Sequence, residues 1–98
     1  MRKEIACDAL IQGKRLKLSY DGLERIVEVH AVGLNKQRQE VMFVWQVRGG
    51  SESGEQTGWK LLMLDKVSLM QVTDEKSTAV RGAKNTSIST MTHVYCEI

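Results

Sequence analysis

A change in hydrophobic period at Gly13 constrains this chain more than any other feature. Across residues 2–12, apolar side chains recur four positions apart, as at Ile5 and Ala9, so they share one face of a helix. Gly13 follows at the point where helices commonly end, because glycine readily adopts the left-handed backbone conformation. Beyond it, apolar and polar residues alternate singly. The sequence therefore predicts one N-terminal helix followed by strands.

The first alternating segments predict a β-hairpin. Leu16 and Tyr20 point to the same side of a first strand that starts at about residue 15. Asp21-Gly22 then supplies a two-residue turn, which is the strongest short hairpin signal. The next strand, over residues 24–32, carries apolar side chains on both faces. We expect this second strand to be covered on both sides in places.

Further strands are expected up to about residue 72 and again at the C-terminus. Val41 to Val47 is apolar on both faces, which indicates a central strand. A loop rich in glycine and serine follows it, and residues 73–89 are polar and weakly patterned. The remaining predicted strands are Trp59 to Leu64, Val67 to Val72 and about residues 90–98.

The composition is typical of one globular domain and excludes several classes of protein. Of the 98 residues, 42% are hydrophobic and 27% are charged, so we expect a single domain over residues 1–98. A formal charge of +2 excludes a polybasic nucleic-acid arm or an acidic tail. No apolar run approaches the ~20 residues that span a bilayer, and no cleavable signal pattern follows Met1. We therefore expect a cytoplasmic protein with no membrane partner.

These elements together predict a mainly β fold of five or six antiparallel strands with an N-terminal helix. Sheets this small avoid exposed edges by curling into a barrel. We expect a small, strongly bent barrel with the helix covering one open end. Because only 5% of the residues are aromatic, aliphatic side chains must supply most of the core.

The catalytic inventory of the sequence is small. The only two histidines, His30 and His93, have no evident orienting partner. A Ser/His/Asp arrangement can be written down, but nothing around the serines of residues 49–54 resembles a nucleophile elbow. No phosphate-binding glycine loop opens a helix either, so no cofactor is expected.

The two cysteines, Cys7 and Cys96, do not predict a metal site. No pair among the cysteines and histidines has the short spacing of structural zinc sites, and on a strand His93 and Cys96 would lie on opposite faces. The cysteines come from opposite ends of the chain and could approach each other in a compact fold. The sequence leaves open whether they pair.

Charged and aromatic residues on or beside the predicted strands are the best candidates for a ligand site. Arginine offers a planar fork that suits phosphate or carboxylate, and tryptophan offers a face on which a base can stack. If these side chains converge outside the barrel, they would bind a nucleotide, a nucleic acid or another small anion. The candidate ligand-binding residues are Arg25, His30, Gln46, Arg48, Trp59, Lys60 and Arg81.

Several short segments occur in a recognisable order over most of the chain. They are Leu18 to Gly22, Glu24 to Glu28, His30 to Gly33, Trp45 to Val47, Gly50 to Gly54, Gly58 to Leu61, Leu64 to Val67 and Val80 to Gly82. In this order and spacing the chain resembles the WYL-type domains of bacteria, and more closely a short, stand-alone branch related to them.

The resemblance implies an SH3-like barrel that senses a ligand. In larger relatives this domain follows a helix-turn-helix and binds ligands, often nucleotides or nucleic acid. Arg25 matches a family arginine that tends to line the ligand groove. This chain departs from the family because it shows no DNA-binding segment, has Val41-Met42-Phe43 near the Trp-Tyr-Leu stretch, and lacks the proline after the second strand. We expect a sensor-like module that is not a DNA-binding regulator by itself.

Three functions remain open from the sequence. The first is a non-catalytic ligand-binding module, as described above. The alternative is a structural or protein-interaction module that forms homo-oligomers through edge strands, at Val41 to Val47 or at residues 90–98. The third, and least supported, is a hydrolase that uses His30 or His93.

Overall fold

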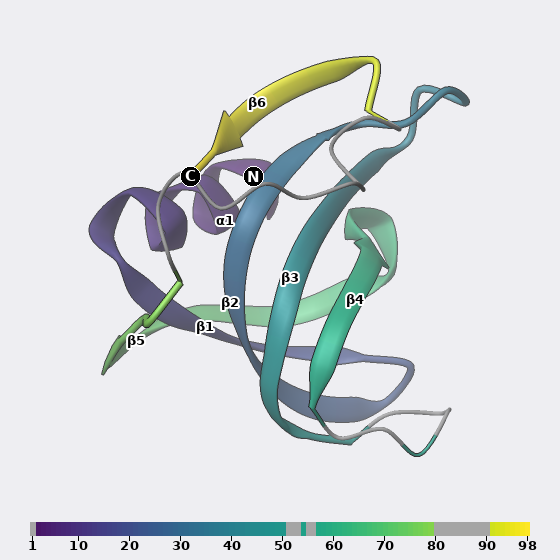
Figure 1. Cartoon of the computed structure of the whole chain (residues 1–98). Helices are drawn as coiled ribbons and strands as arrows, with labels where there is room; N and C mark the ends of the chain where they lie inside the picture. The colour runs from purple at the N-terminus through teal and green to yellow at the C-terminus, as the bar shows by residue number, and fades with distance from the viewer. Residues whose placement is uncertain (1, 51–53, 55–56, 80–90) are drawn as a thin grey trace.

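A computed structural model describes residues 2–50, 54, 57–79 and 91–98 of the chain. The described part is mainly β, with an N-terminal helix packed against one antiparallel sheet, as the sequence predicts (Figure 1). In chain order the elements are α1 (Arg2–Gln12), β1 (Lys14–Tyr20), β2 (Leu23–Leu34), β3 (Glu40–Gly49), β4 (Gly58–Met63), the single 3-10 turn η1 (Leu64–Lys66), β5 (Val67–Lys76) and β6 (His93–Glu97).

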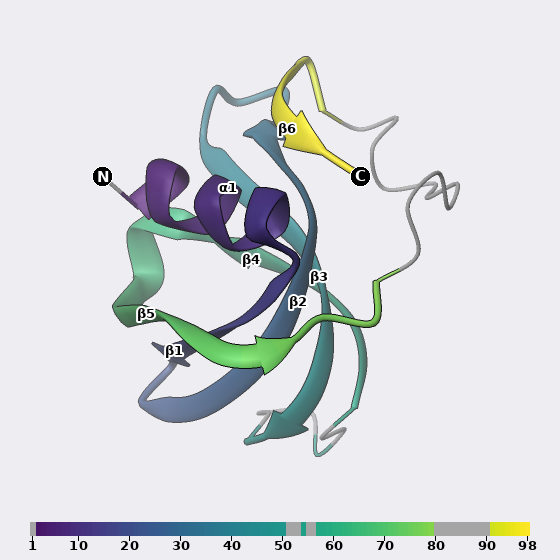
Figure 2. The ribbon, with the colours of Figure 1, turned by 90° about the vertical axis from the view of Figure 1, so that its left-hand side faces the viewer.

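The helix ends as the change of period predicts. Gly13 has a φ of 67°, in the left-handed region, and its N–H donates to the Leu10 carbonyl at 3.2 Å. Ala6, Ala9 and Leu10 are the buried side chains of α1. Figure 2 shows that α1 lies between β6 on one side and the β1–β5 pair on the other. The helix therefore covers an opening of the curved sheet, as expected.

The predicted hairpin is also present. Asp21 and Gly22 have φ angles of 54° and 74°, so both central residues are left-handed, as a type I′ turn requires. The turn joins Tyr20 of β1 to Leu23 of β2, which are direct cross-strand partners.

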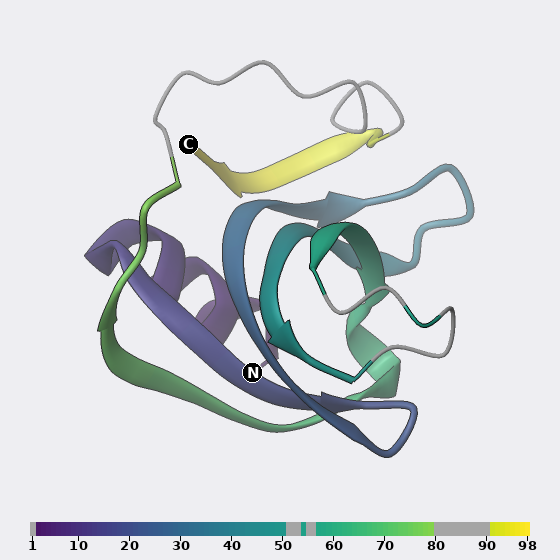
Figure 3. The same cartoon turned by 60° about the horizontal axis from the view of Figure 1, so that its bottom comes forward.

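The sheet is organised around β2. The strand order is β4-β3-β2-β1-β5, and β6 pairs with β2 outside this path. β3 runs along one edge of β2, while the other edge is shared by β1 at residues 23–27 and by β6 at residues 31–34. Register shifts at two places in the β2–β3 ladder accompany the strong curvature visible in Figure 3. β5 returns to pair with β1 and adds the last strand of the path to this small, strongly curved antiparallel sheet.

The core lies between the concave side of the sheet and α1. It is almost entirely aliphatic, as the low aromatic content predicts, and includes Leu16, Leu18, Val27, Val29, Val32, Met42, Val44, Leu62, Leu64 and Val67. β2 is buried from Arg25 to Gly33, which agrees with its apolar residues on both faces.

β3 is a central strand, as predicted, since it pairs with both β2 and β4. The prediction that Val41 to Val47 extends a sheet across a homo-oligomer is therefore wrong, because the backbone groups of a central strand are already used. β4, β5 and β6 each pair with one neighbour among the described residues, so these three strands present an edge there.

β5 continues four residues beyond the predicted end at Val72, to Lys76. Its last residues lack a clear apolar pattern because much of this edge strand is exposed, and pairing with β1 holds it in place. Lys76, for example, lies directly opposite Lys14. The predicted C-terminal strand is shorter than residues 90–98, at His93–Glu97.

Cys7 of α1 and Cys96 of β6 form a disulfide, with their Cα atoms 5.9 Å apart. This pairing, left open by the sequence, links two elements separated by 89 residues. β6 also passes so close to Gly33 that a Cβ there would overlap the His93 carbonyl. No helix in the described ranges is long and apolar enough to cross a membrane.

Candidate ligand-binding surface

The candidate residues do not form one cluster. Arg25 and Gln46 lie together inside the barrel, His30 and Trp59 lie together on its outer face, and Arg48 belongs to an ion-pair network. Lys60 lies on β4 opposite Val44. Arg81 lies outside the described residues.

Arg25 is buried, contrary to the expectation that the arginines lie outside the barrel. Only 3% of it is exposed, and its Nη1 and Nη2 donate to Gln46 Oε1 and the Tyr20 carbonyl, both at 3.4 Å. The Asp21 carboxylate lies 3.9 Å from Nη2, while Nε has no acceptor among the described residues. Gln46 is fully buried and donates to the Gly50 carbonyl at 3.2 Å. These contacts tie β2 to the hairpin turn and to the end of β3.

This position follows from register. Arg25 is the cross-strand partner of Leu18, and Gln46 that of Val27, so both share the inward face with core residues. Polar side chains on that face must find partners inside the protein, because buried unpaired polar groups are costly. Arg25 and Gln46 are bonded to each other and to the Tyr20 and Gly50 carbonyls.

On the outer face, four rings form what we call the aromatic platform: Phe43, Trp45, Trp59 and His30. The Trp59 ring stacks on Phe43, with centroids 4.8 Å apart and planes 11° apart. Trp45 and His30 meet Trp59 edge to face, at 5.1 and 4.7 Å between centroids. Trp45 and Trp59 are direct cross-strand partners on β3 and β4. The platform is therefore built by pairing across three strands.

Trp59 is the accessible part of the aromatic platform. It is 49% exposed, as is Leu61 two residues further along β4, whereas Phe43 and His30 are buried. Three rings hold the indole, yet about half of its surface faces solvent. Because the ring is already ordered, a ligand that contacts it loses little conformational entropy from the protein side.

His30 contributes an uncharged imidazole ring to the platform. Burial lowers the pKa of its imidazole, and the nearby Glu28 carboxylate only partly offsets this effect. Its Nδ1 has no hydrogen-bond partner in the described part of the chain. A neutral ring in contact with Trp59 extends the apolar surface and carries no charge that would bind an anion.

Arg48 belongs to an ion-pair network beside the platform. Its guanidinium forms a two-pronged ion pair with Glu75, which also accepts from Arg15 Nη1 at 3.1 Å. Arg15 Nε donates to the buried Glu28 carboxylate at 3.0 Å, and the Thr78 N–H donates to the same carboxylate at 2.8 Å. Arg48 and then Arg15 lower the pKa of Glu75 to about 2. The two arginines are thus neutralised by two carboxylates.

Sequence reasoning missed several residues of this surface. Phe43, Trp45 and Leu61 were not among the candidates, although all three share the outer face with Trp59. A signal was present, because Phe43 and Trp45 alternate with Met42 and Val44 along one strand. Arg15, Glu28 and Glu75 carried no such signal, since their partners are distant in sequence.

Within the described residues, no group of three His, Cys, Asp or Glu side chains lies close enough to hold a metal ion.

The chain was also compared with known proteins. No family model, curated protein or solved structure matches it. The resemblance to WYL-type domains therefore stays a prediction.

Proposed function

We propose that this protein is a small, non-catalytic binding module that holds a planar aromatic ligand, such as the base of a nucleotide or nucleic acid, against Trp59. The observation that carries the proposal is the half-exposed Trp59 ring, fixed by Phe43, Trp45 and His30. Trp59 and His30 are also ligand-binding candidates for the same chemistry by their residue types and strand positions.

Stacking is the interaction that this surface favours. A base on an aromatic side chain contributes about 1–3 kcal/mol and tolerates any base, because every base has a π-face. Arg48 and Arg15 are engaged with Glu75 and Glu28, so they add little net positive charge. Lys60 follows Trp59 in sequence but is the cross-strand partner of the core residue Val44, so it lies on the other face of β4 and adds no charge beside the ring. We therefore propose binding that depends mainly on stacking and only weakly on salt.

In this proposal Arg25 and Gln46 have a structural role and do not contact the ligand. A guanidinium that is 3% exposed and hydrogen-bonded to Gln46 and Tyr20 holds the hairpin against β3. The ligand-groove role implied by the WYL resemblance would require Arg25 to exchange these bonds for a ligand.

The hydrolase hypothesis has less support. Neither His30 nor His93 has a hydrogen bond to a carboxylate within the described residues, and Glu28 is occupied by Arg15 and Thr78. The His93 ring instead meets Tyr95 edge to face at 5.2 Å. A general base needs an orienting partner, so we propose that neither histidine is catalytic.

The test is a fluorescence titration of the two tryptophans with adenosine monophosphate and a short oligothymidine. We expect quenching on binding, and Trp59→Ala should weaken the affinity about tenfold or more. Leu69→Ala removes another exposed apolar side chain, on β5 and outside the platform, and should change nothing. Absence of binding at millimolar ligand, or equal binding by Trp59→Ala, would refute the proposal.

A second candidate function is assembly into a homo-oligomer through β4. In the described sheet β4 pairs only with β3, and it presents both Trp59 and Leu61 at 49% exposure. Two copies could pair their β4 edges and cover these side chains together. Light scattering at high concentration distinguishes the functions: a dimer that Leu61→Lys dissociates supports assembly, and a strict monomer excludes it.

The cytoplasmic location expected from the sequence is also a proposal, and the disulfide bears on it. Disulfides persist mainly in oxidising compartments. If the protein resides in a reducing cytoplasm, Cys7 and Cys96 should be free thiols there. Alkylation of lysates followed by mass spectrometry would decide, since protected cysteines from freshly quenched cells would contradict a cytoplasmic location.

A further inference from the structure

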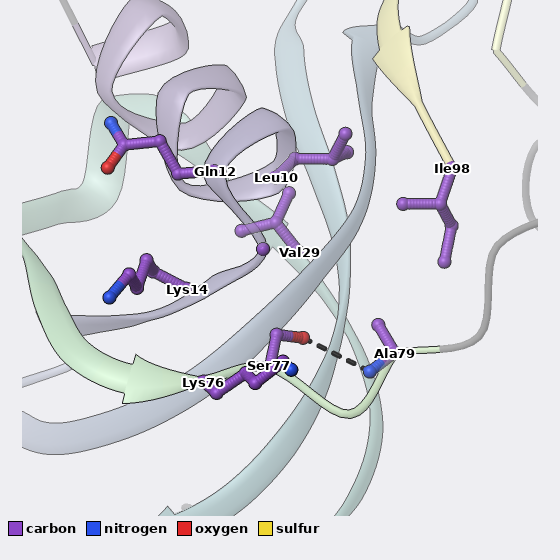
Figure 4. Close-up of a pocket in the computed structure, with 9 residues that line it drawn as sticks. Leu10, Gln12, Lys14, Val29, Lys76, Ser77, Ala79 and Ile98 are labelled. Carbon is purple, nitrogen blue, oxygen red and sulfur yellow. Dashed lines mark hydrogen bonds between the residues drawn. The ribbon is translucent and has the colours of Figure 1, made fainter.

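A cavity of about 390 Å³ lies where the end of α1, the start of β1 and the chain after β5 meet (Figure 4). Its size falls within the range of small-molecule sites. It is formed around Val29, on the core-facing side of β2, whereas the aromatic platform occupies the outer face. The lining residues are Leu10, Gln12, Gly13, Lys14, Val29, Lys76, Ser77, Ala79 and Ile98.

The lining is divided into two chemically different parts. Leu10, Val29 and Ile98 supply an apolar wall, and Figure 4 shows them grouped toward the helix and β6 side. Lys14 and Lys76 lie apart from that group, toward β1 and β5. A molecule that fills the cavity must therefore present an apolar portion to one part and a polar head to the other.

The lysines make the polar part cationic. Lys14 and Lys76 are direct cross-strand partners on β1 and β5, and like charges opposite each other are destabilising. Neither ammonium has an ion-pair partner in the described ranges of the chain. Ser77 does not serve as one, because its N–H donates to the Gly13 carbonyl and its hydroxyl accepts from Ala79. The pair lacks a counter-charge that an anionic ligand would supply.

We propose that this cavity binds a single-chain amphiphile with a carboxylate head and a short alkyl tail. The head lies between Lys14 and Lys76, and the tail lies against Leu10, Val29 and Ile98. Apolar burial of the tail provides most of the affinity, and the two ammonium groups set the orientation and the preference for an anion. This site is independent of the stacking surface at Trp59.

The lysines could instead serve only to complement the partial negative charge at the C-terminal end of α1. In that case their removal would lower stability and leave ligand binding unchanged. The two roles are separable because one is measured by unfolding of the free protein and the other by titration of a ligand.

The experiment is a calorimetric and amide-NMR titration of the full chain with octanoate, with octanol and acetate as matched probes. We expect octanoate to bind and to shift the amides of residues 10–14 and 76–79. Octanol should bind at least about tenfold more weakly because it lacks the charge, and acetate should not bind because it lacks the tail.

Two variants complete the test. Lys14→Met with Lys76→Met should weaken octanoate about tenfold and bring it level with octanol, while Ala79→Trp should fill the cavity and abolish binding. Amide spectra of both variants establish that they fold. Equal binding of octanoate and octanol to the native chain, octanoate affinity unchanged in the lysine double variant, or shifts confined to residues 59–61 would overturn the proposal.

Discussion

The inner and outer faces of the sheet each hold a group of ordered side chains, but the two groups differ in exposure. On the inner face, Arg25 and Gln46 are buried and bonded to each other. On the outer face, Trp59 is held just as firmly by neighbouring rings, yet it remains half exposed. The sequence made Arg25, Gln46 and Trp59 all ligand-binding candidates, with Arg25 the strongest single one. The two groups differ in whether their ordered side chains are accessible to solvent.

The comparison teaches that order and accessibility are separate requirements for a binding surface. Arg25 is ordered but not accessible, so its removal should affect folding more than binding. Trp59 is both ordered and accessible, so its removal should affect binding more than folding.

The largest effect is expected on the inner face, where the Cys7–Cys96 disulfide joins α1 to β6. Cys96→Ser should lower the free energy of unfolding by about 4 kcal/mol, because the bond closes a long loop in the unfolded chain. Urea unfolding of the native chain and the variant measures the difference. The outer aromatic platform should keep its tryptophan fluorescence in the folded variant, and a changed emission would show that the faces are coupled.

Arg25→Met should lower the free energy of unfolding by about 2–3 kcal/mol, because Gln46 and the Tyr20 carbonyl lose a buried charged donor. Arg48→Met is the matched control, since it removes a guanidinium that is largely exposed. Its unfolding midpoint should stay close to the native value. If the two variants unfold alike, Arg25 does not have the structural role assigned to it.

Trp59→Ala should lower the free energy of unfolding by about 1–2 kcal/mol, since it removes the stack on Phe43 while about half of the ring is already exposed. Phe43→Ala, on the same platform, should lower it by about 3 kcal/mol because Phe43 is buried. Thermal unfolding of the two variants gives both values. A larger loss for Trp59→Ala than for Phe43→Ala would mean that Trp59 is mainly a structural residue.

The smallest effect concerns the ion-pair network on the outer face. The pKa of Glu75 is lowered to about 2 from the usual 4.5, chiefly by Arg48. A depressed pKa stabilises the fold above the usual value and stops doing so as the carboxylate protonates between pH 4.5 and 2. The melting temperatures of the native chain and Glu75→Gln should therefore converge across this window. A constant difference down to pH 2 would contradict the assignment.

Local patterns in the sequence were sufficient for much of the fold. The helix over residues 2–12, its end at Gly13 and the hairpin at Asp21-Gly22 depend on neighbours in the chain, and all are present. The central position of β3 followed from its two apolar faces. The end of β5 could not be predicted, because pairing with β1, and not its own pattern, keeps residues 73–76 extended.

The candidate surface was predicted only in part. Trp59 and His30 were both among the ligand-binding candidates, and their rings lie in contact. Alternation places Arg25 on the same face as Val27, and Gln46 on the same face as Val44, so the sequence held a signal for their inward orientation that polarity alone obscured. The partners of Arg48 were out of reach for a simpler reason, since Glu75 is 27 residues away.

The sequence by itself determined which segments are helix or strand, where they turn, and that aliphatic residues fill the core. These properties depend on spacing and on the backbone preferences of single residues. Only the tertiary structure decided that Arg25 is buried and that Trp59 is half exposed. It also decided that Cys7 forms a disulfide with Cys96 and that Lys14 is the cross-strand partner of Lys76. These depend on register and curvature, which arise when strands far apart in the chain are packed against one another.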